Sequence, residues 1–426
     1  MLSKTVERLV ARQLVDHLNL WKLMPDLQSA YRAHHSTETA VLRVLSDILV
    51  ALDRGDFAVL PLLDLSAAFD TVDHETLLRR LETSYGIRGT VLSWFASYLH
   101  ERQQFVRCRN STSTQSYILY GVPQGSVLGP ILFLLYTADL IKLVKVRDLH
   151  PHLYADDTQL YGFCSPDRAL ALQERVTECI SDVAAWMRSN RLQLNAAKTE
   201  VLWCASGRRQ GQLPDTPFTV GSDAVKPVRC VRDLGIYLDS DVSMRIHVSK
   251  TVASCFASLR QIRSIQRSVS RPVLLSLVTS LILSRLDYGS ATLAGIPAYL
   301  IDRLQSILHA AARLVNGSRK YDHVSLLLRD LHWLRVPERI MYRLAVLVFR
   351  CRNHTAPEYL TRDLHWVADD DSRRRLRSAT THQLMVPRTR LRTVGDRAFG
   401  TAGARVWNDL PSSVVSAPSL AVFKRI

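Results

Sequence analysis

Apolar residues recur every three or four positions along much of this chain, which is the spacing of one face of an α-helix. An early example is the face formed by Val6, Leu9, Leu14 and Leu18. The helices that this spacing predicts cover residues 4–20, 36–55, 165–190, 243–266, 271–286, 298–316 and 336–352. The chain is therefore expected to be rich in helix, above all after residue 240.

Two segments depart from the helical spacing and predict strands. Residues 58–63 are an unbroken apolar run, typical of a strand buried on both faces, and the run ends just before Asp64. Residues 152–161 place apolar and aromatic residues on both sides of a polar tip, which predicts strand, tight turn and strand. Pro61 lies inside the first strand, where it removes a main-chain donor, so we expect either a bulge or a mildly damaged strand.

Carboxylates lie at the ends of these predicted strands. Asp64 ends the first strand, and the adjacent pair Asp156 and Asp157 forms the tip of the hairpin. Like charges this close raise each other's pKa unless a cation lies between them, and Mg²⁺ prefers such oxygen ligands. Two Mg²⁺ ions held here could serve phosphoryl transfer by a two-metal mechanism. A solvated Asp-Asp turn without metal is the alternative interpretation.

The charge balance points to a polyanionic partner. The chain has 55 Lys and Arg against 39 Asp and Glu, a net charge of +16. Neutralisation of phosphates supplies most of the nonspecific affinity for nucleic acid, although a merely soluble basic protein is the alternative. Seven scattered cysteines suit reduced intracellular thiols better than a disulfide framework or a zinc site. Neither a signal peptide nor a membrane-spanning segment is evident, so we expect the protein in the cytoplasm or the nucleus.

Three motifs follow one another in a recognisable order. They are the strand ending at Asp64, the loop Gly121 to Pro130, and the box Tyr154 to Asp157. In this order and spacing they resemble the reverse transcriptases of non-LTR (LINE-type, Jockey-like) retrotransposons, specifically from Gln28 to Asp239 and weakly over nearly the whole chain. The resemblance implies an RNA-directed DNA polymerase that uses an RNA template, a DNA primer and deoxynucleoside triphosphates. Its cofactor would be Mg²⁺, which Mn²⁺ can replace.

The same resemblance implies an α+β fold, a right-handed fingers–palm–thumb polymerase with an antiparallel palm sheet and a mainly helical thumb. Residues 1–240 would form fingers and palm, including a hairpin over 232–239 that resembles the primer grip. Residues 241–360 would form the helical thumb and its extension, and residues 361–426 a basic, irregular tail. Two groups of arginines in this tail could follow phosphates or simply be solvated: Arg373, Arg374, Arg375 and Arg377, and then Arg388, Arg390 and Arg392.

Roles at the reaction centre are also implied by the resemblance. Asp64 and Asp156 would be the principal Mg²⁺ ligands, with Asp157 adjoining them. Lys198 matches the position proposed to protonate the departing pyrophosphate, and an ammonium near a developing phosphate charge suits that task. A solvated turn lysine is the competing interpretation.

Four further residues would bind the incoming nucleotide and its template. Phe69 matches an aromatic gate whose ring leaves no room for a 2′-hydroxyl, although a core phenylalanine is the competing interpretation. Gln124 and Gly125 would lie against the nascent base pair and the template. Arg32 would face the template or the incoming triphosphate, unless it is a solvated loop arginine.

Only a short helix precedes the predicted fingers, so we expect the product of a truncated element that lacks its endonuclease. Two other functions stay open at this point. The chain could be a catalytically inactive remnant that acts only as a basic RNA-binding protein. It could also be a phosphodiester nuclease, because nucleases likewise use clustered carboxylates and Mg²⁺. The sequence leaves the oligomeric state open.

Overall fold

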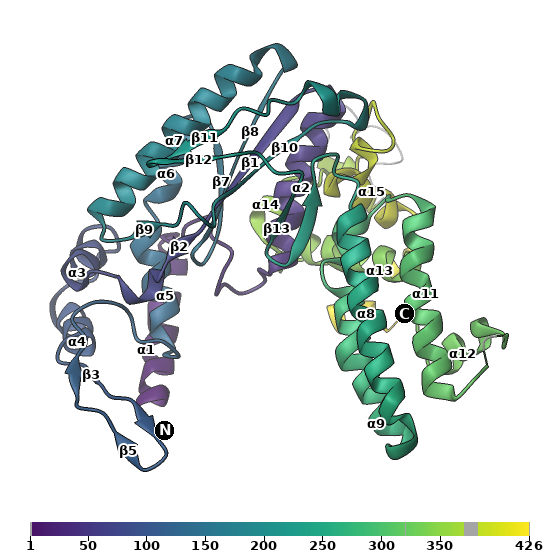
Figure 1. The fold of residues 1–426 in the computed structure, drawn as a ribbon, viewed down its shortest axis with the longest axis horizontal. Helices are drawn as coiled ribbons and strands as arrows, with labels where there is room; N and C mark the ends of the chain where they lie inside the picture. The colour runs from purple at the N-terminus through teal and green to yellow at the C-terminus, as the bar shows by residue number, and fades with distance from the viewer. Residues whose placement is uncertain (1, 320, 370–381, 426) are drawn as a thin grey trace.

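An antiparallel sheet lies at the centre of the structure, a computed structural model that describes residues 2–319, 321–369 and 382–425. Its strand order is β10–β1–β8–β7, and every neighbouring pair is antiparallel (Figure 1). The strands are β1 (Phe57–Leu63), β7 (His150–Tyr154), β8 (Asp157–Cys164) and β10 (Glu200–Cys204). The strands that the sequence predicted at 58–63 and around residue 156 are thus confirmed.

The central strand β1 is buried on both faces. Phe57, Val59 and Leu63 point into one hydrophobic core, whereas Ala58 and Leu60 point into another. This alternation follows from the pleat, since successive side chains of a strand point to opposite faces. The sheet is therefore held between two cores, and Asp64 follows directly on a strand whose residues are all buried except the half-buried Leu62.

Pro61 lies within β1 without a bulge. β1 pairs with β8 at Val59 and Gly162 and again at Leu62 and Gln159, and the register is the same on both sides of this gap. Pairing with β10 continues through Pro61. Proline has no N–H to donate, so two pairings with β8 are left out while the register is kept.

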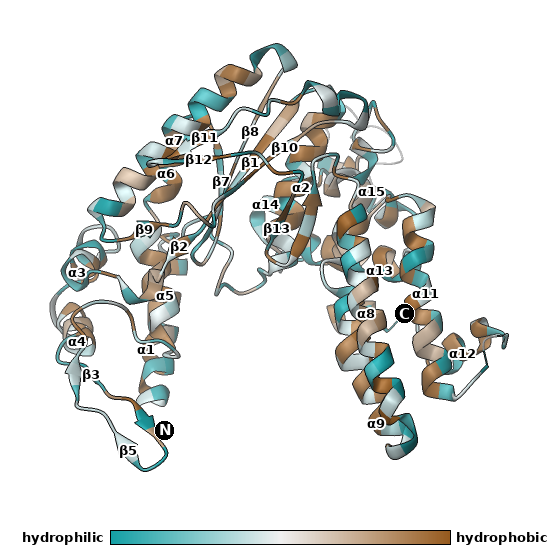
Figure 2. Cartoon of the chain, viewed as in Figure 1, coloured by the Kyte–Doolittle hydropathy of each residue, from teal (hydrophilic) through white to brown (hydrophobic). Residues whose placement is uncertain are grey.

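Helices cover both faces of the sheet, and hydrophobic residues run along α2 and α5 (Figure 2). One face packs against α2 (Thr37–Arg54), and six helices pack on the other side, of which the first and the last were predicted at 4–20 and 165–190. The six are α1 (Leu2–Leu20), α3 (His74–Thr83), α4 (Gly89–Leu99), α5 (Leu128–Thr137), α6 (Leu140–Val146) and α7 (Ala169–Ser189). Ser36 caps α2 by accepting a hydrogen bond from the N–H of Thr39 at 3.1 Å, and Gly55 ends it in the left-handed region, which agrees with the helix predicted at 36–55.

Short antiparallel ladders connect these elements. The ladder nearest to Asp64 joins β2 (Leu65–Ser66) to β9 (Gln193–Leu194), and the predicted hairpin at 232–239 is present as β13 (Cys230–Asp233) and β14 (Ile236–Asp239). The remaining pairs are β3 (Gln103–Gln104) with β6 (Ser116–Tyr117), β4 (Arg107–Cys108) with β5 (Ser111–Thr112), and β11 (Phe218–Val220) with β12 (Asp223–Val225).

After β14 the chain becomes helical, as predicted. The helices are α8 (Arg245–Ile265), α9 (Arg271–Val278), α10 (Ser284–Asp287), α11 (Ala298–Asn316), α12 (Val324–Asp330) and α13 (Val336–Arg352). A π-helical segment, Thr279–Leu283, joins α9 to α10, so the predicted helix at 271–286 is continuous. In Figure 1, α8, α9, α11 and α12 extend away from the sheet, and we call them the helical limb. No helix within the described ranges is apolar over the length that crossing a membrane requires.

The C-terminal region is more ordered than the irregular tail that the sequence predicted. It contains α14 (Glu358–Thr361), α15 (Phe399–Asn408), α16 (Ser412–Val415) and α17 (Leu420–Phe423). Phe399 and Trp407 of α15 are buried, because apolar residues at helical spacing pack this helix against α13. The arginines 388, 390 and 392 are exposed on a segment without helix or strand, and the arginines at 373–375 and 377 lie outside the described residues.

Candidate active site

The turn between β7 and β8 presents the acidic pair. Tyr154 pairs with Asp157 across the hairpin, so the two-residue turn is Ala155 and Asp156, and Asp157 begins β8. The predicted strand, tight turn and strand are present, but the turn lies one residue earlier than the predicted tip of Asp156 and Asp157. Ala155 has a φ of 57°, in the left-handed region that alanine rarely adopts. The buried side chain of Gln28 holds it there: its Oε1 accepts from the N–H of Ala155 at 3.0 Å, and its Nε2 donates to the carbonyl of Ala155 at 3.3 Å.

Asp64 comes to this turn from the neighbouring strand β1. Its carbonyl oxygen accepts a hydrogen bond from the N–H of Asn195 at 2.9 Å, which fixes the chain where β1 ends. Its carboxylate oxygen Oδ1 lies 3.5 Å from Nζ of Lys198. Asp64, Asp157 and Lys198 line one pocket of about 310 Å³. Four residues that the sequence singled out, counting Asp156 in the adjacent turn, are therefore brought together.

The carboxylates of this site influence each other's ionisation. Burial, with the charge of Asp64 nearby, raises the pKa of Asp156. Desolvation and the charges of Asp156 and Asp64 raise the pKa of Asp157 to about 6. Both shifts have the direction that the sequence predicted for clustered carboxylates, and they mark a place where a cation would lower the free energy.

The donor set fits a divalent cation that a substrate helps to bind. Within the described ranges, no group of three or more His, Cys, Asp or Glu side chains is arranged to hold an ion by itself. Mg²⁺ characteristically takes one or two carboxylates and completes its shell with water and substrate phosphates. Asp64 and Asp156 can supply those carboxylates, and Asp157 adjoins them.

Phe69 packs directly against the acidic turn. It lies in a short 3₁₀ segment, Ala68–Asp70, and stacks on Phe133 with ring centroids 4.4 Å apart. It also packs against the small apolar cluster that contains Ala155. The ring is only partly buried, so its position is compatible with both of the roles that the sequence left open, a gate or a core residue.

The loop that carries Gln124 and Gly125 is fastened to the same 3₁₀ segment. Nε2 of Gln124 donates to both carboxylate oxygens of Asp70, at 2.8 and 3.0 Å. Gly121 has a φ of 89°, and a Cβ there would lie 2.8 Å from the main chain of Asp70. Gly125 has a φ of 72° and open space around its Cα. The loop can therefore approach a ligand closely, and Asp70 is a residue of the site that the sequence did not single out.

Arg32 binds its own loop in this structure. Its Nη1 donates to the carbonyl oxygens of Pro25 at 2.6 Å and of Gln28 at 3.2 Å. Burial lowers the pKa of its guanidinium. Through these bonds Arg32 helps to hold the main chain at Gln28. A contact of Arg32 with template or triphosphate stays a prediction.

Several residues that support the site carry no local signal in the sequence. Gln159 of β8 donates to Asp233 of the hairpin β13–β14, and Asp233 is buried with a pKa raised to about 7, chiefly by burial. This bond ties the strand that follows the acidic turn to the predicted primer-grip hairpin. A buried carboxylate paired with an amide 74 positions earlier cannot be recognised without the fold.

Comparisons with known proteins agree with this geometry. A family model described as reverse transcriptase (RNA-dependent DNA polymerase) matches residues 1–238. The probable RNA-directed DNA polymerase from transposon BS of Drosophila melanogaster is 30% identical over 354 residues, which are 80% of this chain and 38% of that protein. Its counterpart from the X-element of the same fly is 27% identical over 339 residues, 78% of this chain and 36% of that protein. The chain thus spans less than two fifths of either transposon polymerase.

A solved structure with a weaker likeness is the apo telomerase from Candida tropicalis. It is 12% identical with a TM-score of 0.43, and the alignment covers 84% of this chain and 61% of that chain. That TM-score is too low to support an argument about this fold.

Proposed function

This chain belongs to the reverse transcriptase (RNA-dependent DNA polymerase) family, among its LINE-type members, and we propose that it adds deoxynucleotides to the 3′-hydroxyl of a primer while copying an RNA template. The observation that carries this proposal is the meeting of Asp64, from the end of β1, with the Asp156 turn of β7–β8 and with Lys198. Two carboxylates and an ammonium at one pocket are the groups that phosphoryl transfer requires.

In the proposed mechanism Asp64 and Asp156 hold the divalent cation, which we take to be Mg²⁺ with Mn²⁺ as a substitute, and Asp157 adjoins them. When bound, such ions lower the pKa of the attacking hydroxyl and balance the charge that develops on pyrophosphate. Lys198 donates a proton to the leaving pyrophosphate oxygen. Its position beside Asp64 supports this role, because the ammonium is already held at the reaction centre.

Selection of the nucleotide rests on groups around the same turn. Phe69 closes the space that a 2′-hydroxyl would occupy, and its packing against Ala155 and Phe133 keeps the ring in place. Gln124 and Gly125 contact the nascent base pair from a loop that Asp70 anchors. Arg32 lies at the template side, in the loop that precedes α2.

The architecture proposed for this reaction is a right hand. Residues 1–240 form the fingers and the palm, whose sheet is the antiparallel one described above. Residues 241–360 form a helical thumb with its extension, and residues 361–426 a basic C-terminal region. RNA template, DNA primer and deoxynucleoside triphosphates are the proposed partners, and the net charge of +16 supports a polyanionic ligand.

Primer extension by Asp156→Asn tests this function. Loss of one anionic ligand should lower deoxynucleotide incorporation on a primed RNA about 100-fold or more while RNA binding is kept, because a two-metal site depends on its ligand charges. Asp148→Asn is the matched control, since Asp148 pairs with Arg175 on the surface.

Three outcomes would contradict the proposal. Incorporation by Asp156→Asn above a few per cent of the parent would remove Asp156 from the reaction. A parent that binds RNA but never extends a primer would be a basic RNA-binding remnant. Cleavage of nucleic acid by the parent that Asp156→Asn abolishes, without any extension, would identify a nuclease.

A further inference from the structure

The distal end of the helical limb carries a hollow lined by arginines. It is a groove of about 660 Å³ between the C-terminal halves of α8 and α11, which lie side by side in Figure 1. Arg260 and Arg263 reach it from α8, and Arg313 and Arg319 from the end of α11 and the turn that follows. We call this hollow the arginine groove.

The guanidinium groups of the arginine groove have no carboxylate partner in the part of the chain that the structure describes, although the carboxylate of Asp322 accepts from the main-chain N–H of Arg319 at 2.6 Å. No carboxylate of that part pairs with any of the four guanidinium groups, and none lines the groove. Nε of Arg313 is buried and has no hydrogen-bond partner among the described residues. A buried unpaired donor in a cluster of four positive charges is costly, so an anion there would stabilise the protein.

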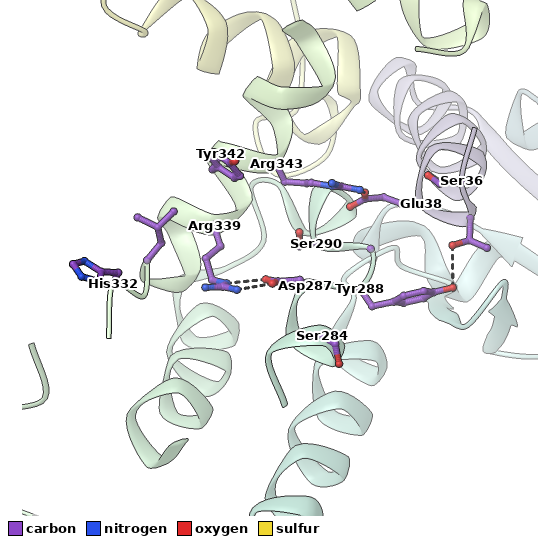
Figure 3. Close-up of a pocket in the computed structure, with 13 residues that line it drawn as sticks. Ser36, Glu38, Ser284, Asp287, Tyr288, Ser290, His332, Arg339, Tyr342 and Arg343 are labelled. Carbon is purple, nitrogen blue, oxygen red and sulfur yellow. Dashed lines mark hydrogen bonds and ion pairs between the residues drawn. The ribbon is translucent and has the colours of Figure 1, made fainter. Parts of the chain in front are cut away.

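The arginines that line another cavity are paired with carboxylates and hold elements of the fold together. In Figure 3, Arg339 faces Asp287 and Arg343 faces Glu38, each with a closest N–O distance of 2.5 Å. These pairs fasten α13 to α10 and to the first turn of α2, and the cavity between them measures about 450 Å³. The arginine groove has no such partners among the described residues, and its charges therefore do not join elements of the fold.

The floor of the arginine groove is apolar. Phe256 and Leu259 form it from α8, and Ala310 and Leu314 from α11. A positive rim above an apolar floor suits a ligand that has both phosphates and flat apolar rings. α8 starts just after the hairpin β13–β14, and a rise of about 1.5 Å per residue puts the groove roughly 15–30 Å along the helix from that hairpin. The groove shares no lining residue with the pocket of Asp64 and Lys198.

We propose that the arginine groove is a second nucleic-acid site, which binds the phosphates of a single-stranded segment and accepts its bases on the apolar floor. The proposal rests on the polymerase function above, because such an enzyme must hold its template strand while copying it. A duplex keeps its bases stacked inside and would use only the arginines. A single strand can present phosphates and bases to the same groove, so it uses both the rim and the floor.

Binding measurements without deoxynucleotides test this site independently of catalysis. The variant Arg260→Gln/Arg263→Gln/Arg319→Gln removes three exposed charges, and Arg79→Gln/Arg168→Gln/Arg188→Gln removes three exposed charges on α3, the 3₁₀ turn before α7, and α7. Fluorescence anisotropy compares a single-stranded RNA, a DNA of the same sequence, a blunt RNA–DNA hybrid of the same length and a glutamate-rich peptide. Thermal melting by circular dichroism checks that each variant is folded.

For single-stranded RNA, the groove variant should raise Kd about tenfold at about 0.1 M salt, and the slope of log Kd against log salt should fall by about 0.7 for each phosphate that the variant no longer neutralises. The control triple should stay near the parent, and the blunt hybrid should change less than about threefold. A parallel loss for single-stranded DNA also supports the site, because both strands carry the same phosphates. Ala310→Glu, which adds a carboxylate to the floor and keeps all arginines, should give the same loss.

Equal affinity of the groove variant and the control triple for single-stranded RNA would overturn the proposal. An equal loss for the hybrid would assign the groove to duplex binding, and a loss confined to the acidic peptide would assign it to a protein partner. Either result would also overturn it. A chain that fails to extend primers but gives the expected binding pattern would contradict the polymerase function and leave this site in place.

Discussion

Tyr359 and Ser29 lie 330 positions apart in the sequence, yet the hydroxyl of Tyr359 is 2.9 Å from Oγ of Ser29. The same Oγ is 2.9 Å from Nε2 of His152 in β7, the strand that leads into the acidic turn. The Tyr359 hydroxyl also donates to Oγ1 of Thr39 at 3.2 Å. Tyr359 lies far outside residues 1–238, the part matched by the reverse transcriptase family model. It nevertheless belongs to the hydrogen-bond network that holds β7, the first strand of the proposed catalytic hairpin.

Tyr359→Phe removes only this hydroxyl. We expect the free energy of unfolding to fall by about 1 kcal/mol, since buried partners lose a hydrogen bond. Chemical denaturation followed by circular dichroism measures the change. Tyr321→Phe is the control, because Tyr321 is 89% exposed. If both substitutions leave the unfolding midpoint where it is in the parent, the hydroxyl of Tyr359 does not contribute to the stability of this hydrogen-bond network.

Gln28→Ala removes the side chain that holds Ala155 in its left-handed conformation. The N–H groups of Ala155 and Ala30 would both lose their acceptor, so we expect about 2–3 kcal/mol less stability. Displacement of the acidic turn should also lower the rate of single-nucleotide incorporation by roughly 10- to 100-fold. Primer extension on a primed RNA, quenched at a series of times, measures the incorporation rate. Gln212→Ala, at an exposed position, is the control. A full rate in a folded Gln28→Ala protein would show that the turn holds its shape alone.

Phe69→Val tests the sugar gate. The smaller side chain opens the space beside Ala155, so incorporation of ribonucleotides relative to deoxynucleotides should rise at least about tenfold, as a change of this size in the volume of a pocket permits. Phe105→Val is the control, because Phe105 is 53% exposed. The measurement is single-nucleotide incorporation of both substrates by each protein. An unchanged ratio would assign Phe69 to the core that it shares with Phe133.

The parts of the site that the sequence predicted well are those with a local pattern. An apolar run followed by Asp64, and a polar pair between two apolar runs at Asp156 and Asp157, fix strand and turn positions within a few residues. The meeting of these carboxylates then follows once β1 and β8 are neighbours in the sheet. Pro61 was harder to interpret, because sequence alone does not show whether a strand bulges or merely loses pairings.

The parts that the sequence could not predict depend on contacts between distant segments. Gln28 and Ala155 are 127 positions apart, and neither residue type indicates the other. The C-terminal region was predicted to be irregular because its many arginines hide the apolar spacing of Phe399 and Trp407. The carboxylate of Asp53, at the end of α2, accepts hydrogen bonds from the N–H groups of Arg390 and Leu391 and so fixes that region on the fold.

The fully buried His152 predicts a loss of stability in mild acid. Burial, with smaller contributions from Arg43 and His35, lowers the pKa of His152 to about 3 from the ordinary value of 6.5. The folded protein therefore binds fewer protons than the unfolded chain between these two values. The contribution of His152 is complete above pH 6.5 and is lost as the pH falls toward 3, by about 2 kcal/mol at pH 5.

His152→Gln isolates this contribution from those of other buried groups. Between pH 7 and pH 5 the free energy of unfolding of the parent should fall by about 2 kcal/mol more than that of His152→Gln, because glutamine does not take up a proton. Other groups, such as Asp363, whose pKa burial raises to about 6, act alike in both proteins and cancel in the difference. Urea titrations at each pH measure the free energy of unfolding. His365→Gln, at an exposed position, should lose as much of it between pH 7 and pH 5 as the parent does. Parallel pH profiles of the parent and His152→Gln would mean that the folded protein admits a proton at His152 without cost.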